Sequence, residues 1–296
     1  MKKTRYIIEA LLLRILFVFF KCLPPQTASN VGGFIGRTIG PRMAASRKAY
    51  RHLQTALPEK DKNAQRVIIK GMWDNLGRVI AEYPHLKKLS TDYTEIHDLT
   101  GEQSALHSDG AAVFIGAHLA NWEINCIASY TQLDLPITLT YREPNNPMVA
   151  ELLEKSRTLN GQLTALPKSR ESGKKLLQTL KNAKTLGILI DQKYNEGIEV
   201  PFFGHSAMTN PVFVQLCQRY KCPLIPVRCE RIKGCHFKLT AYPAIPTLDE
   251  QGKPLPTQDV INAAHKHIEK WIRQRPEQWL WVHRRWKKTP KGTESD

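Results

Sequence analysis

The sequence lacks the cysteine spacings that metal-binding and redox motifs require. Its six cysteines include no C-x2-C pair. The last four, Cys217, Cys222, Cys229 and Cys235, are separated by five, seven and six residues, which matches no common zinc framework. The spacing therefore argues against a metal centre and favours reduced, mostly buried thiols in a reducing compartment.

Runs of consecutive basic residues are also absent, although basic residues are abundant. Lysine and arginine number 43 against 27 acidic residues, a net charge of +16, yet no run of five consecutive basic residues occurs. Such an excess on a folded surface indicates an anionic partner: a nucleic acid, an acidic protein or an anionic membrane. Because the sequence contains no zinc-finger, RNP or helix-turn-helix pattern, a basic nucleic-acid-binding protein is the alternative and not the leading hypothesis.

The N-terminal segment has an apolar stretch but no small-residue cleavage site of the kind that ends a signal peptide. Tyr6 to Leu23 is mostly apolar and carries three charged residues, Glu9, Arg14 and Lys21. This makes it a poor membrane span and an untidy in-plane amphipathic helix. We expect residues 1–23 to form a membrane-anchoring helix and leave open whether it crosses the bilayer; a core helix is the alternative.

Beyond Pro24-Pro25, which should end that helix and leave few core contacts dependent on it, the chain divides by pattern. Residues 24–100 predict a helical cap with a glycine-rich turn at 32–40, residues 101–288 an α/β core, and residues 289–296 a frayed tail. Strands alternate with helices in the core, which indicates a largely parallel central sheet flanked by helices. The expected strands are 111–117, 136–141, 185–191, 223–229 and 235–242, and the expected helices are 121–132, 146–159, 171–183, 209–221 and 257–274.

The stretch Ala111 to Asn125, AAVFIGAHLANWEIN, joins a buried strand to a helix and places a histidine between them. His118 stands at the carboxyl end of the strand, where ligands bind in open α/β sheets, and Asn121 is a suitable N-cap for the helix. On a continuous helix, His118 and Glu123 would lie about 140° apart. They can act as general base and orienting carboxylate only if the chain bends near Asn121. A structural histidine beside a dipole-stabilising glutamate is the alternative.

Four further charged residues lie at the ends of predicted elements. Arg142 follows the strand 136–141, and Asp191 closes an apolar strand, so both should reach the same sheet edge as His118. Arg157 and Arg170 could hold a phosphate or another anion through the guanidinium fork. A helix-dipole contact for Arg157, an ion pair for Arg170 and a turn or cap role for Asp191 are the structural alternatives.

Together these segments resemble a known family. Gly116 to Glu123, GAHLANWE, is similar to the H-x4-D/E signature of glycerolipid and lipid A acyltransferases. Further elements follow in order: the segment Tyr141 to Pro147, Arg157, Arg170 and Asp191-Gln192. The set resembles the late acyltransferases of lipid A biosynthesis, the lauroyl/myristoyl acyltransferase family, over nearly the whole chain to about Trp286.

The resemblance implies a membrane-associated O-acyltransferase that uses neither a metal nor a nucleotide. It implies His118 and Glu123 as catalytic residues and Arg142, Arg157, Arg170 and Asp191 as substrate-binding residues. The implied donor is an acyl chain on acyl carrier protein, and the implied acceptor is a hydroxyl of a phosphorylated lipid A precursor at the cytoplasmic face of the inner membrane. An acceptor such as a lysophospholipid or another glycolipid is the alternative within enzymes.

Two aromatic segments complete the set of candidates. The resemblance implies that the loop Gly197 to Asn210 closes over the site and lines an acyl pocket. The C-terminal PEQWLWVHRRW combines three tryptophans with basic residues. It could lie at a membrane interface or stack on bases, but packing beneath the domain is the interpretation we favour slightly.

Overall fold

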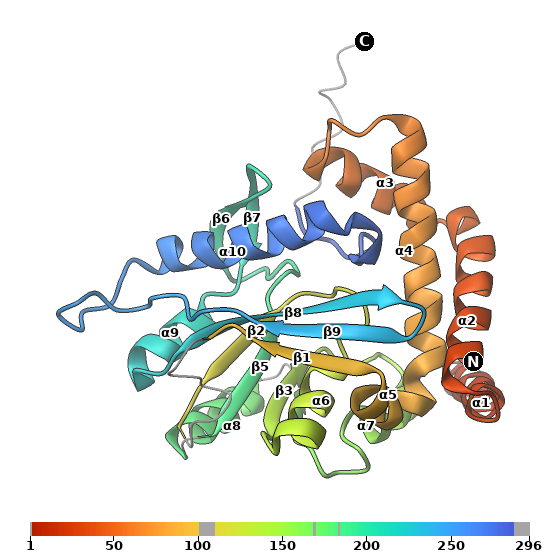
Figure 1. Ribbon diagram of the computed structural model, residues 1–296, viewed down its shortest axis with the longest axis horizontal. Coiled ribbons are helices and arrows are strands. Elements are labelled where there is room, and N and C mark those ends of the chain that lie inside the picture. Colours follow the sequence, from red (N-terminus) through yellow and green to blue (C-terminus); the bar gives the residue numbers. More distant parts are fainter. Residues whose placement is uncertain (1, 101–109, 168–169, 183, 287–296) are drawn as a thin grey trace.

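A seven-stranded sheet forms the centre of the computed structural model, which describes residues 2–100, 110–167, 170–182 and 184–286 (Figure 1). The strand order is β1-β9-β8-β2-β5-β3-β4. Neighbouring strands of this sheet pair parallel except β8 and β9, which pair antiparallel. The prediction of a largely parallel sheet is therefore confirmed. The strands are β1 (Thr94–Asp98), β2 (Val113–Gly116), β3 (Ile137–Tyr141), β4 (Ala165–Pro167), β5 (Thr185–Leu189), β8 (Leu224–Lys233) and β9 (His236–Ala241).

Strand β2 is buried on both faces, because its alternate side chains enter two different parts of the core. Val113 and Ile115 pack with residues of α9 (Val212–Tyr220) and α10 (Thr257–Gln274). Phe114 packs on the other side with Cys126 of α6 (Ile124–Leu133) and with neighbouring strands. Figure 1 shows α10 above the sheet and α6 below it. The short apolar run in the sequence reflects this two-sided burial.

The glycines at 32–40 do not form the expected turn. Gly32, Gly33 and Gly36 lie inside α2 (Pro25–Ile39), which packs on α4 (Lys62–Glu82). A Cβ atom at Gly36 would lie 2.1 Å from the carbonyl oxygen of Trp73, and one at Gly77 would lie 2.1 Å from that of Gly32. The glycines are therefore needed for close helix packing, where any side chain would separate the two backbones.

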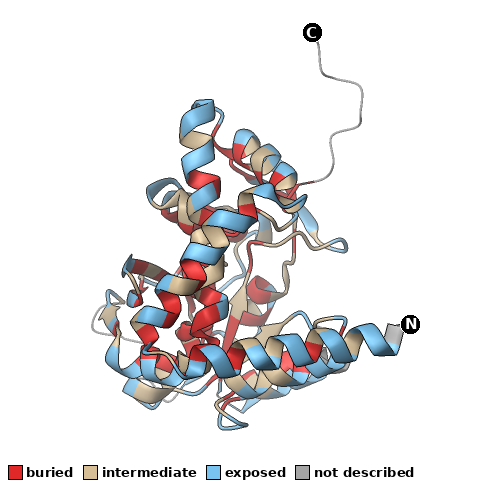
Figure 2. Ribbon diagram, turned by 90° about the vertical axis from the view of Figure 1, so that its right-hand side faces the viewer, coloured by how far each residue is buried: buried red, intermediate tan, exposed pale blue. Residues whose placement is uncertain are grey.

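Helix α1 (Lys2–Lys21) contributes to the core on one side and exposes apolar residues on the other (Figure 2). Phe17 stacks on Tyr83 with ring centroids 5.6 Å apart, and Phe20 is buried among residues of α2 and α4. More core contacts depend on this segment than the sequence led us to expect. Its exposed apolar side chains are Ile7, Ile8, Leu11, Leu12, Ile15, Val18 and Phe19. None of the helices in the described part of the chain combines the length and apolar character that a membrane crossing requires.

Two segments have a different secondary structure from the one that the sequence pattern predicts. Strand β1, within the segment expected to be a helical cap, pairs with β9 and belongs to the central sheet. The segment 197–210 forms an antiparallel hairpin of β6 (Ile198–Phe202) and β7 (His205–Thr209) and not a loop. The expected frayed tail, 289–296, lies outside the described residues. The remaining helices are α3 (Ala45–Ala56), α5 (Leu86–Asp92), α7 (Pro147–Arg157) and α8 (Arg170–Lys181), with short 3-10 helices at Gly40–Arg42, Tyr83–His85 and Pro276–Gln278.

Candidate active site

Three neighbouring parallel strands bring the predicted polar residues to one edge of the sheet. His118 follows β2, Asp191 follows β5, and Arg142 follows β3 directly. Because β5 pairs with both β2 and β3 in parallel, the carboxyl ends of all three strands meet at this edge. The sheet topology therefore assembles the site from segments that are 24 to 73 residues from His118 in the sequence.

The imidazole of His118 is held by Asp191. Nδ1 of His118 lies 2.7 Å from Oδ1 of Asp191, and the His118 backbone N–H donates to Oδ2 over 2.9 Å. The Trp279 indole N–H donates to the same Oδ2 over 2.7 Å. Burial alone would raise the pKa of Asp191, but His118 and these hydrogen bonds outweigh it and hold that pKa well below its usual value. A stable carboxylate here requires a proton on Nδ1 of His118, which leaves Nε2 as the basic nitrogen.

Glu123 belongs to a different network. The guanidinium of Arg157 binds its carboxylate with two bonds, Nε to Oε2 at 2.8 Å and Nη2 to Oε1 at 2.7 Å. The Tyr83 hydroxyl donates to Oε1 over 2.6 Å. Burial would raise the pKa of Glu123, but the charge and hydrogen bonds of Arg157 outweigh it and the pKa is lowered. Within the described part of the chain no hydrogen bond joins Glu123 to His118, so the geometry gives the orienting contact to Asp191 and not to Glu123.

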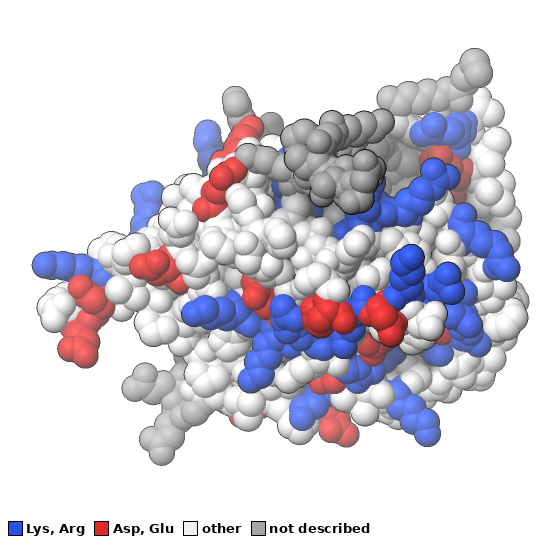
Figure 3. Space-filling view, turned by 90° about the horizontal axis from the view of Figure 1, so that it is seen from above, with Lys and Arg blue, Asp and Glu red and all other residues white. Residues whose placement is uncertain are grey.

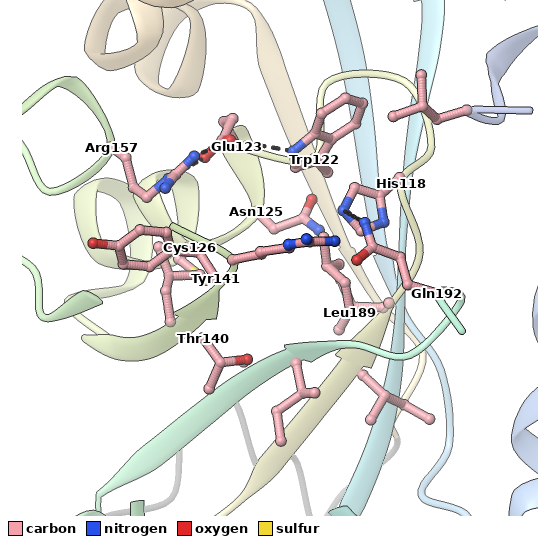
Figure 4. A pocket seen from close by; sticks show the side chains of 18 of the residues that line it. His118, Trp122, Glu123, Asn125, Cys126, Thr140, Tyr141, Arg157, Leu189 and Gln192 are labelled. Carbon is pink, nitrogen blue, oxygen red and sulfur yellow. Dashed lines mark hydrogen bonds and ion pairs between the residues drawn. The ribbon is translucent and has the colours of Figure 1, made fainter. Parts of the chain in front are cut away.

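The chain does bend between the two residues, as their spacing requires, but the bend is at Ala120 with φ +50°. Asn121 then accepts hydrogen bonds from the backbone N–H groups of Glu123 and Ile124, through its side chain and its carbonyl respectively. The turn directs Glu123 away from His118 and toward Arg157 (Figure 4). Trp122 connects the two groups, because its indole N–H donates to Glu123 over 3.2 Å and its ring lies edge-on to His118, with centroids 5.1 Å apart.

A cavity of about 800 Å³ opens beside these networks. Its lining changes character along its length. The apolar part lies between the sheet and α6, and the polar part includes His118 and several cations. The apolar side chains include Phe114, Cys126, Leu133, Ile137, Leu139, Val227, Leu239 and Ala241, and the polar ones include Lys48, His118, Arg142, Gln192, Lys193, His283 and Arg284.

The other residues predicted to bind substrate are placed as follows. Arg142 is exposed and lines the cavity. Arg157 also lines it, but its guanidinium is occupied by Glu123 and lies over the Tyr141 ring, 4.7 Å from the ring centroid. The backbone of Arg170 begins α8, and its side chain lies outside what the structure describes. Arg142 therefore lines the cavity without an ion pair to any carboxylate that the structure describes, whereas Arg157 is bound to one.

The hairpin at 197–210 does not line the cavity, contrary to what the resemblance implied. Phe202 and Phe203 are buried in the main core. Phe202 contacts the rings of Trp279, Trp286 and His265. Because its aromatic side chains are used in packing, the hairpin supports the C-terminal segment and does not cover the site.

The amino-acid sequence is similar to those of known proteins. The family model for bacterial lipid A biosynthesis acyltransferases matches residues 1–288. The chain is 22% identical over 284 residues to the lipid A biosynthesis palmitoleoyltransferase of Escherichia coli, covering 92% of this chain and 89% of that protein. It is also 22% identical over 258 residues to the lipid A biosynthesis lauroyltransferase of Escherichia coli, covering 83% and 80%.

The chain belongs to the bacterial lipid A biosynthesis acyltransferase family. It is therefore an O-acyltransferase of lipid A biosynthesis, which favours the enzyme hypothesis over a nucleic-acid-binding protein. The cavity of about 800 Å³ lies beside the imidazole of His118 in this lipid A acyltransferase. The family match covers every segment that contributes to the site.

Sequence reasoning did not assign three residues of this acyltransferase to the site, although it quoted Gln192 within Asp191-Gln192 and the other two within the C-terminal segment. Trp279 contacts Asp191, while Gln192 and His283 line the cavity beside His118. Trp279, Trp281 and Trp286 are buried, so the interpretation of the C-terminal segment as packing is confirmed. The segment also forms part of the site, because Leu280 N–H donates to the His118 carbonyl and Leu119 pairs with Trp279. In the sequence, the position of His283 between Trp281 and Trp286 was the one feature that could have indicated its place in the site.

The Glu123–Arg157 pair predicts a specific stability effect. Replacing Arg157 by methionine leaves a buried carboxylate without its cation, and we expect it to lower the free energy of unfolding by about 3–5 kcal/mol. Lys155→Met on the same helix is the matched control, because its ion pair with Glu151 is exposed and such pairs are worth about 0–1 kcal/mol. Urea denaturation measures both. Equal free energies of unfolding for the Arg157→Met and Lys155→Met proteins would contradict the stabilising role of the buried Glu123–Arg157 pair.

Proposed function

We propose that this acyltransferase moves a fatty acyl chain from acyl carrier protein to a hydroxyl of a phosphorylated lipid A precursor, with His118 as the general base. The observation that carries the mechanism is the His118–Asp191 contact. Asp191 accepts a hydrogen bond from Nδ1–H, so the Nε2 lone pair faces the cavity side where Gln192 lies. A hydroxyl placed there can transfer its proton to Nε2 as its oxygen attacks the acyl carbonyl.

The apolar part of the cavity supports an acyl chain as the group transferred. Its lining residues extend along α6 from Asn125 to Leu133, a distance of about 12 Å at 1.5 Å per residue. Apolar walls of this kind favour an alkyl chain by removing it from water. We therefore place the acyl chain between the sheet and α6, with its carbonyl carbon beside His118.

The polar part of the cavity supports anionic substrates. Lys48, Arg142, Lys193 and Arg284 line it. Burial and the nearby charges of Arg284 and Arg51 lower the pKa of Lys48, as expected where like charges gather. A phosphate on the acceptor, or on the arm of the donor protein, would relieve this repulsion. Lysine and arginine side chains also gather across the middle of the face shown in Figure 3, with several acidic side chains among them. The basic excess of the chain suits an acidic carrier protein.

The exposed apolar side of α1 supports attachment to a membrane. Phe34, Ile35 and Ile39 of α2 and the adjacent Met43 are also exposed. Apolar side chains displayed in this way can enter the boundary between headgroups and acyl chains without a membrane crossing. We propose that α1 and α2 lie against the cytoplasmic face of the inner membrane, where the lipid acceptor is available.

Removal of the base tests the mechanism. We expect His118→Ala to lower the rate of acyl transfer by about 10²–10⁴, because proton transfer in the transition state loses its acceptor. His205→Ala is the control, since His205 is an exposed residue of the hairpin. Mass spectrometry of a lipid A precursor incubated with acyl carrier protein donor measures the product. Near-normal turnover by His118→Ala would contradict the general-base role.

The donor predicts a distinct dependence on salt. In uncharged detergent with a fixed acceptor, kcat/KM should be much higher for acyl carrier protein than for a short acyl-pantetheine at low salt. This advantage should fade as the screening length falls from about 10 Å at 0.1 M to about 3 Å at 1 M. Arg284→Gln should reduce it at low salt, whereas Lys253→Gln, which alters an exposed residue that does not line the cavity, should not. Equal efficiency and equal salt response of the two donors would mean that the charge serves the lipid alone.

A further inference from the structure

The basic nitrogen of His118 faces two residues that the proposed general-base step does not use. Nε2 of Gln192 lies 3.1 Å from Nε2 of His118 and also hydrogen-bonds to Nδ1 of His283. The rings of His118 and His283 are 4.9 Å apart between centroids. All three side chains line the same cavity, and Figure 4 shows Gln192 beside the ring of His118. Gln192 therefore bridges two imidazoles across the place where the reaction would occur.

Counting hydrogens fixes the state of each group. Asp191 accepts a hydrogen bond from the Nδ1–H of His118, so Nε2 of the neutral ring carries a lone pair. The amide nitrogen of Gln192 has two hydrogens and can donate one to each ring. Nδ1 of His283 is then an acceptor, and its proton is on Nε2. Burial, helped by the nearby His118, lowers the pKa of His283 to about 4, so this ring is a neutral N–H donor at neutral pH.

Two sets of donors near His118 that could stabilise negative charge on the acyl oxygen are already engaged. Arg157 is bound by Glu123 through two hydrogen bonds. The backbone N–H groups of Glu123 and Ile124, at the start of α6, are satisfied by Asn121. By contrast, no hydrogen bond within the described part of the chain occupies Nε2 of His283. Gln192 and His283 are the cavity-lining N–H donors that lie beside the ring of His118. The side chains of Lys48, Asn125, Arg142, Lys193 and Arg284 also line the cavity.

We propose that the N–H groups of His283 and Gln192 bind the thioester carbonyl oxygen and stabilise the oxyanion that forms on it. This inference rests on the proposed function of the site. In the free protein one amide hydrogen of Gln192 caps Nε2 of His118. The acceptor hydroxyl displaces that hydrogen when it binds to Nε2, and the freed N–H turns to the carbonyl oxygen while the other hydrogen stays on His283. Binding the acceptor and completing the oxyanion site thus occur together.

The reaction then balances without any further reactant. The hydroxyl proton passes to Nε2 of His118 while the hydroxyl oxygen forms a bond to the carbonyl carbon. The carbonyl electron pair moves to its oxygen, where His283 and Gln192 donate hydrogen bonds. Collapse of the intermediate restores the carbonyl and breaks the carbon–sulfur bond. The leaving thiolate takes the proton from Nε2, which returns His118 to its neutral form.

Two substitutions at His283 distinguish a hydrogen bond from its ring to the oxyanion from a purely structural contact with Gln192. A glutamine side chain carries an amide N–H at about the reach of the imidazole Nε2, whereas an asparagine side chain reaches only as far as Nδ1. His283→Gln can therefore keep the donor that faces the substrate, and His283→Asn can keep only the contact with Gln192. We expect His283→Asn to lower kcat by about 10²–10³, with the KM of the donor little changed, and His283→Gln to retain clearly more activity. His205→Gln is the control for an unrelated exposed histidine.

The opposite order would overturn the proposal. If His283→Asn equals or exceeds His283→Gln in kcat, the ring acts only by supporting Gln192. Should both His283 variants fail to fold by circular dichroism, Gln192→Met decides, because methionine keeps the length of the side chain without a donor; unchanged kcat there would refute the role. A large loss of kcat in Arg142→Gln together with normal His283 variants would assign the oxyanion to Arg142. Absence of acyl transfer by the unmodified protein would instead refute the proposed function.

Discussion

The structure of this active site depends on one buried carboxylate. Asp191 accepts three hydrogen bonds, from the ring and the backbone of His118 and from the indole of Trp279. These bonds join β2, β5 and the C-terminal segment at a single point. A buried carboxylate is costly unless its charge and lone pairs are satisfied, so His118 and Trp279 are held where Asp191 needs them. The position and tautomer of His118 follow from this requirement.

The second carboxylate supports the site from the other side. Glu123 is locked by Arg157 and Tyr83, and through Trp122 it contacts the ring of His118. Phe17 of α1 stacks on Tyr83, so the helix proposed to lie on the membrane touches this network directly. The Phe17–Tyr83 pair therefore connects α1 to the Glu123 network. Asp191 is paired with the imidazole of His118 and Glu123 with the guanidinium of Arg157, and Trp122 contacts both Glu123 and His118.

The sequence predicted the elements better than their partners. The central strands β2, β3 and β5 were expected, β2 and β5 because they are apolar runs, whereas the edge strand β1, TEIHD, is polar and the β6–β7 hairpin contains Pro201 and Gly204. His118 and Asp191 were both placed at the carboxyl edge. Which strands are neighbours depends on packing across the sheet, so the spacing of residues along the chain does not predict that Asp191 contacts His118. The five-residue interval therefore favoured Glu123 as the partner of His118, while a bend at Ala120, a residue with no turn signature, sent it to Arg157.

The central claim is that Asp191, and not Glu123, sets the tautomer of His118. Nitrogen-15 NMR of the His118 ring tests it most directly, at a pH at which the ring is neutral. Oδ2 of Asp191 accepts from two N–H groups, so in Asp191→Asn the single amide oxygen should take that place and turn the NH2 group toward Nδ1. We predict a proton on Nδ1 in the unmodified protein and in Glu123→Gln, and on Nε2 in Asp191→Asn. A tautomer that changes in Glu123→Gln and stays unchanged in Asp191→Asn would contradict this account.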